Sequence, residues 1–187
     1  MRYAATTPNP VDWPNEMVVE VDDHDLEILE LLFVRSAWGL GGHSGAPVST
    51  GPIDTGSSRR PVRLRDDVER TWADEWATLL QSKPTIRNTT RWHDKYGWEG
   101  IDQEALEAWV DSVRGESRQM RPIEEAPETK AQGSLIAAWR RGLRRVTVLP
   151  VEAWSQQRDE DELIVAAEVR ADESAYRLAL DGFTSSR

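Results

Sequence analysis

Residues 36–61 constrain the fold of this chain more than any other stretch. They hold six of the twelve glycines and three of the ten prolines, and almost no large apolar side chains. Glycine raises the entropic cost of ordering a segment and proline removes a backbone donor, so a long helix or a central strand is excluded here. Loops longer than about 12–15 residues tend to be functional or disordered. We therefore expect residues 39–61 to form a long loop that becomes ordered on contact with a partner.

The same stretch contains parts of three enzyme motifs, and each is incomplete. The nucleophile elbow G-x-S-x-G fails because Ala46 replaces its last glycine. The dinucleotide-binding pattern G-x-G-x-x-G fails because Ser44 stands at the final glycine position. A P-loop needs a Gly-Lys pair, which the chain lacks. These comparisons favour a binding role for the loop over a catalytic one.

Helical periodicity dominates the rest of the chain. Apolar side chains spaced by three and four residues predict helices over residues 22–38, 65–84, 102–115, 134–145 and 172–180. We expect Asp22 or Asp23 to cap the first helix and Gly39 to end it. Asp102 is expected to cap the third. Apolar and β-branched runs predict short strands over residues 17–21, 146–151 and 162–169.

These elements indicate an α+β fold that is predominantly helical. We expect four to six helices and a small sheet of two or three strands toward the C-terminal end. The prolines near the start predict an extended N-terminal arm over residues 1–16. The remainder, residues 17–187, is expected to form a single domain that contains the loop 39–61 and a surface linker over residues 115–133.

Charge and composition limit the possible partners. The net charge is −10, and residues 1–58 carry nine acidic residues against Arg2 and Arg35. Such a chain repels nucleic acid and has no apolar run long enough to cross a membrane, so we expect neither partner. It has no cysteine and 20 of its 23 basic residues are arginine, which favours a cytoplasmic protein, or one assembled into a particle, from a bacterium or bacteriophage.

Three histidines raise the possibility of metal chemistry. A distant His43 and the adjacent pair His93 and Asp94 loosely resemble the His-Asp ligands of metal-dependent phosphohydrolases. Metal ligands are usually held on rigid elements with hydrogen-bonded supporting residues, and His43 lies in the glycine-rich loop. We therefore expect no metal, no cofactor and no catalytic residue. A small metal-dependent hydrolase that uses His43, His93 and Asp94 remains an alternative.

Tryptophan and arginine are the residue types most enriched where proteins meet. Four of the nine tryptophans lie on predicted core faces: Trp72, Trp76, Trp109 and Trp139. Three others lie in or beside predicted loops and are interface candidates. Two arginines at the end of the loop 39–61 are also candidates, as are two arginines spaced i,i+4 on the helix expected over residues 134–145. The candidates are Trp13, Trp38, Trp98, Arg59, Arg60, Arg140 and Arg144.

The sequence thus favours a non-enzymatic interaction or assembly protein. We expect a structural or adaptor subunit of a bacterial or bacteriophage multiprotein complex, whose N-terminal arm and glycine-rich loop contact other protein subunits. Self-association is also open. A further alternative is an acidic inhibitor or immunity-type protein that binds a basic partner through its acidic N-terminal third.

Overall fold

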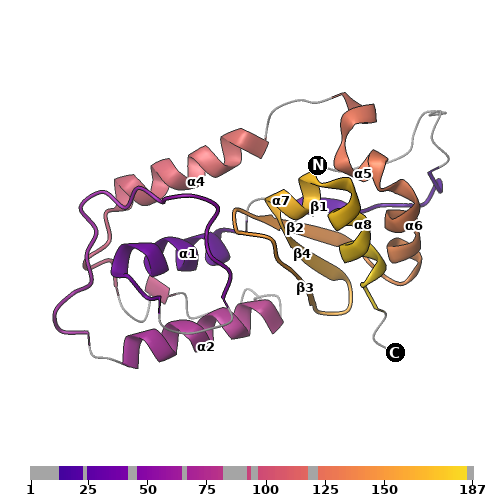
Figure 1. Cartoon of the computed structure of the whole chain (residues 1–187). Coiled ribbons are helices and arrows are strands. Elements are labelled where there is room, and N and C mark those ends of the chain that lie inside the picture. The colour runs from indigo at the N-terminus through magenta and orange to yellow at the C-terminus, as the bar shows by residue number, and fades with distance from the viewer. Residues whose placement is uncertain are drawn as a thin grey trace. The chain divides into compact units, whose positions relative to one another are not determined.

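The computed structural model describes residues 13–22, 25–41, 46–64, 67–81, 92–93, 97–117 and 122–184. The fold is mixed α+β and predominantly helical, with its small sheet toward the C-terminal end, as the sequence predicts (Figure 1). The sheet has four strands, one more than the largest number we expected. The expected N-terminal arm, residues 1–16, lies mostly outside the described residues.

The chain divides into two compact units. The first unit combines Met1–Asp23 with Arg118–Arg187, and the second is formed by His24–Ser117. The second unit is therefore an insertion in the chain of the first.

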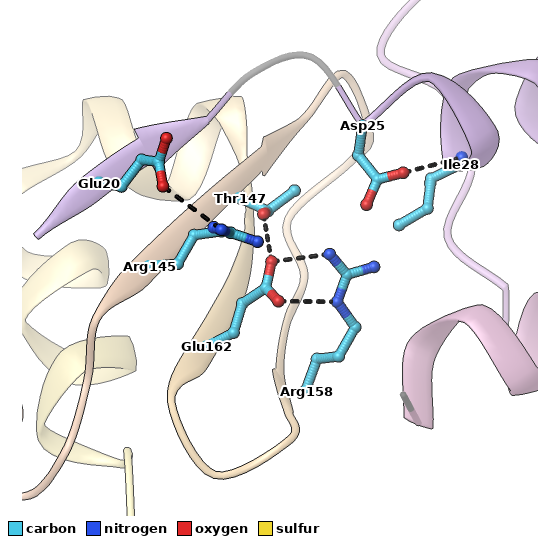
Figure 2. Close-up of polar contacts among 7 residues, drawn as sticks. All are labelled: Glu20, Asp25, Ile28, Arg145, Thr147, Arg158 and Glu162. Carbon is cyan, nitrogen blue, oxygen red and sulfur yellow. Dashed lines mark hydrogen bonds and ion pairs between the residues drawn. The ribbon is translucent and has the colours of Figure 1, made fainter. Parts of the chain in front are cut away.

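The second unit contains the helices α1 (Leu26–Trp38), α2 (Asp67–Gln81) and α4 (Gln103–Ser117). Helix α1 begins later than expected, because its cap is Asp25 rather than Asp22 or Asp23. The Asp25 carboxylate accepts the Ile28 backbone N–H at 3.3 Å, which satisfies a donor of the first turn (Figure 2). The helix ends at Gly39, whose φ of +62° confirms the predicted left-handed cap.

Aromatic side chains form much of the core of the second unit. Trp72 of α2 is buried and its indole N–H donates to the Leu31 carbonyl oxygen of α1 at 2.8 Å. Its ring stacks on Trp76 one turn later, with ring centroids 5.5 Å apart. Phe33 of α1 packs on Trp109 of α4 at 6.0 Å. These contacts confirm the core role predicted for Trp72 and Trp76 and join α1 to both other helices.

The sheet of the first unit has the order β1-β2-β4-β3. Its strands are β1 (Glu20–Asp22), β2 (Arg145–Leu149), β3 (Ser155–Arg158) and β4 (Glu162–Ala166). Strands β1, β2 and β4 run parallel, whereas β3 forms an antiparallel hairpin with β4 and lies at one edge. Strand β3 was not predicted, because its sequence SQQR has no apolar alternation.

In the described part of the first unit, five helical segments accompany this sheet. They are η1 (Ile123–Glu125), α5 (Pro127–Lys130), α6 (Gln132–Arg140), α7 (Ala167–Ala171) and α8 (Glu173–Asp181). Two of them, η1 and α5, lie within the surface linker that we expected over residues 115–133. Glu128 in this stretch is buried, and Arg170 of α7 donates two hydrogen bonds to its carboxylate, at 2.7 and 3.0 Å. The stretch is thus fastened to the first unit by a bidentate ion pair.

Helix α6 ends at Arg140, earlier than expected. Its last turn is followed by Gly142, and Arg145 already belongs to β2. Arg140 and Arg144 therefore do not form an i,i+4 pair on one helix face, which corrects that expectation.

Candidate functional site

A surface groove lies in the first unit between strand β3 and helix α8. Its volume is about 400 Å³, and most of its lining is apolar. Strand β3 and the preceding Trp154 form one wall, α8 forms the other, and Leu163 and Val169 also line it. The most exposed apolar side chain of the lining is Leu178, at 76%. A groove of this size, with an exposed leucine in its wall, suits the binding of apolar groups.

Helix α8 forms this wall because it has two apolar faces. One face comprises Tyr176 and Leu180, which are buried in the core. The second comprises Ala175, Leu178, Ala179 and Gly182, all of which line the groove. Their spacing of three, four and seven residues from Ala175 places them in one stripe. The sequence signal for the groove was therefore present, as a second apolar stripe beside the one that fills the core.

The opposite wall presents an edge strand with free backbone groups. The Ala166 N–H donates to the Trp154 carbonyl oxygen at 2.8 Å, so these two opposed residues form a hydrogen-bonded pair. Such pairs alternate along antiparallel strands, which makes Gln156 opposite Ile164 the next one. The backbone N–H and C=O groups of Ser155 and Gln157 consequently point away from β4. Among the described residues, no strand pairs with this outer edge.

One end of the groove is fixed by the side chain of Gln157. Its amide nitrogen donates to the Thr184 carbonyl oxygen at 2.9 Å, and its amide oxygen accepts the Thr184 N–H at 3.1 Å. These bonds hold the segment after α8 against β3, and with it Phe183, which is buried and lines the groove. The two walls are therefore joined at this end.

The other face of the sheet carries a polar network. In this register Thr147, Glu162 and Arg158 project from the same face of β2, β4 and β3. The Arg158 guanidinium donates to both carboxylate oxygens of Glu162, at 3.0 and 2.7 Å, and the Thr147 hydroxyl donates to the same carboxylate (Figure 2). All three side chains are buried. Beside them, Arg145 pairs with Glu20 of β1 at 3.3 Å. With its charges paired and buried, this network has the features of a structural element rather than of a binding site.

The glycine-rich loop is attached to its own unit in its described part. The Arg35 guanidinium of α1 donates to the carbonyl oxygens of Ala46 and Pro47. The Ser57 N–H and hydroxyl donate to the Asp102 carboxylate at 3.0 and 2.9 Å. We expected this stretch to become ordered on contact with a partner, and in the structure Ala46, Pro47 and Ser57 bond to residues of their own unit. Residues 42–45, including His43, lie outside the described residues.

Gly100 allows the loop to approach α4 closely. The Arg59 N–H donates to the Gly100 carbonyl oxygen at 2.9 Å. Gly100 has a φ of +76°, and a Cβ there would lie 2.2 Å from the Arg59 carbonyl oxygen. Only glycine fits this position without moving the loop.

We expect the attachment of the loop to weaken in acid. The Ser57 backbone N–H, together with the Ala105 N–H and the Ser57 hydroxyl, lowers the pKa of Asp102 below its ordinary value of about 3.9. At pH values above that ordinary pKa, the ionised carboxylate therefore stabilises the attachment of the loop. This stabilisation is lost as the pH falls through the lowered pKa.

At neutral pH, Asp102→Ala should accelerate tryptic cleavage after Arg59 several-fold. Asp111→Ala removes an exposed carboxylate of α4 and should leave the cleavage rate unchanged. Equal cleavage rates in the two variants would contradict the role of Asp102.

The expected interface residues are divided between the two units. Trp38 is only 5% exposed and donates its indole N–H to the Gly100 carbonyl oxygen at 3.2 Å, so its observed role is packing. Trp98 is 39% exposed and stacks on His93, with ring centroids 4.7 Å apart. Of the others, Arg59, Arg140 and Arg144 are exposed, whereas Trp13 and Arg60 are half-buried. Arg144 lies over the Trp139 ring at 5.5 Å.

Of the three residues of the alternative hydrolase site, the structure describes only His93. Its Nδ1 atom lies 3.5 Å from a Glu30 carboxylate oxygen of α1. Asp94 and His43 lie outside the described residues. Within the part of the chain that is described, no group of three or more His, Cys, Asp or Glu side chains has an arrangement that could hold a metal ion.

None of the helices in the described ranges combines the length and the apolar content needed to cross a bilayer. Comparisons with known protein families, with curated proteins and with solved structures found no match to this chain.

Proposed function

We propose that this protein is a non-enzymatic adaptor or structural subunit of a multiprotein complex, in the cytoplasm or in an assembled particle. It binds another protein through the groove between β3 and α8. The arm and the glycine-rich loop, which the sequence favoured as contact segments, are secondary in this proposal, because residues 46–61 already bond to their own unit.

The observation that carries the proposal is the exposed apolar stripe of α8. Leu178 is 76% exposed although the same helix buries Tyr176 and Leu180. Burying an apolar side chain of this size yields about 1.5–3 kcal/mol, which gives a partner a reason to cover the groove. A concave and mostly apolar surface with a few polar groups is also typical of binding sites.

Leu178→Glu should abolish capture of the partner from the native host. The carboxylate would replace an apolar contact and would lose its hydration among the mostly apolar residues that line the groove, which costs several kcal/mol and therefore at least about 100-fold in affinity. The experiment compares the proteins that co-purify with the tagged wild-type chain, with Leu178→Glu and with Val62→Glu.

Val62 is a matched control, because it is a fully exposed apolar residue of the second unit. The control should retain every partner that the wild type captures. If Leu178→Glu also retains them, with an unchanged circular dichroism spectrum, the groove is not the binding surface and the proposal fails.

A further inference from the structure

We infer that the groove binds an extended peptide segment of the partner, which adds as a strand to the outer edge of β3. We also infer that the segment has apolar side chains at alternate positions and carries lysine or arginine. This inference rests on the proposed function and specifies what the groove recognises.

The first argument is that a free strand edge and an apolar helix line the same groove. Ser155 and Gln157 direct their backbone N–H and C=O groups outward, and their side chains line the groove together with Leu178 of α8. A peptide between these walls can exchange backbone hydrogen bonds with β3. Because side chains alternate along a strand, every second one would point toward the groove. Strand addition to a sheet edge beside side-chain pockets is an established mode of peptide recognition.

The second argument is the charge around the groove. Three residues that directly precede lining residues are acidic and exposed: Glu152, Glu168 and Asp181. Two of the neighbouring cations are in ion pairs, Arg177 with Glu173 and Arg170 with Glu128, both at 2.7 Å. A third, Arg141, donates to the Leu180 and Asp181 carbonyl oxygens and offsets part of the acidic charge. The acidic charge of this rim favours a basic segment and disfavours an acidic one.

The experiment selects peptides of random sequence, displayed on phage, against the full-length chain. Enriched peptides should have apolar residues at every second position and an excess of lysine and arginine. Their binding should weaken with added salt, because the exposed acidic residues are screened. Failure to enrich peptides, or enrichment of acidic ones, overturns the inference.

Two matched substitutions then test the backbone bonds. Ser155→Pro removes a donor that points outward and leaves the bonds between β3 and β4 intact, as proline is tolerated at strand edges. Ser155→Ala removes the same hydroxyl and keeps the donor. The proline variant should bind the selected peptide at least about tenfold more weakly than the alanine variant.

N-methylation of the peptide backbone gives a test that leaves the protein unchanged. A methyl group should weaken binding at every second residue of the peptide, where the N–H donates to β3. At the residues between these, whose N–H points away from β3, it should have little effect. Equal tolerance at all positions overturns strand addition.

The two proposals fail in different ways. If Leu178→Glu abolishes partner capture while Ser155→Pro and N-methylation have no effect, the groove binds a partner in another conformation, and only this inference fails. If the wild-type chain dimerises and Ser155→Pro makes it monomeric, the strand that pairs with β3 is β3 of a second copy. That result also overturns the inference of a partner peptide.

Discussion

Replacing Arg158 by methionine is expected to lower the free energy of unfolding by about 3–5 kcal/mol. Arg158 and Glu162 are 3% and 0% exposed, and the two hydrogen bonds between them keep both charges paired. Without the guanidinium, the carboxylate becomes an uncompensated buried charge, which is the costly state. Urea unfolding followed by circular dichroism measures the loss.

Two further variants show whether the effect comes from the unpaired charge. The double variant Arg158→Met/Glu162→Leu should recover most of the stability, because apolar replacement of a whole buried pair is close to neutral. Arg177→Met removes an exposed ion pair of the same 2.7 Å separation and should cost at most about 1 kcal/mol. A loss in Arg158→Met no larger than that in Arg177→Met would contradict the account.

Replacing Trp72 by alanine is expected to cost about 3–5 kcal/mol in the unfolding of the second unit. The substitution leaves a cavity between α1 and α2, and it removes both the stacking on Trp76 and the hydrogen bond from the indole N–H to the Leu31 carbonyl oxygen. Thermal unfolding followed by tryptophan fluorescence measures the effect.

Trp98→Ala is the matched control for Trp72→Ala. Trp98 is the same residue type in the same unit, but it is 39% exposed, so its removal should cost clearly less than that of Trp72. Equal losses of unfolding free energy in the two variants would contradict the claim that the burial of Trp72 and its bond to Leu31 stabilise the unit.

The strongly periodic parts of the fold were predictable. The helices α2, α4 and α8 coincide with apolar residues at intervals of three and four, because each of them buries one such stripe. Helix α1 coincides with an apolar run that is buried nearly all round. The cap of α4 was predicted as well, and the Asp102 carboxylate accepts the Ala105 N–H at 3.1 Å. Such signals lie within a few residues of one another, so a single sequence contains them.

What was missed depends on residues that are distant in the sequence. The loop is held in place by Ser57 and Asp102, 45 positions apart, and no local pattern indicates that bond. Strand β3 is polar, because an edge strand needs backbone partners on one side only. The groove needs both β3 and the second stripe of α8. That stripe is visible in the sequence, but the strand opposite it is not.

Hydrogen–deuterium exchange of the full chain, alone and bound to the partner captured from the host, tests the central claim most directly. The account predicts that binding slows exchange in residues 153–157 and 175–183, the two walls of the groove, with the backbone amides of Ser155 and Gln157 among the most protected. Protection confined to residues 46–64, with the groove unchanged, would contradict it.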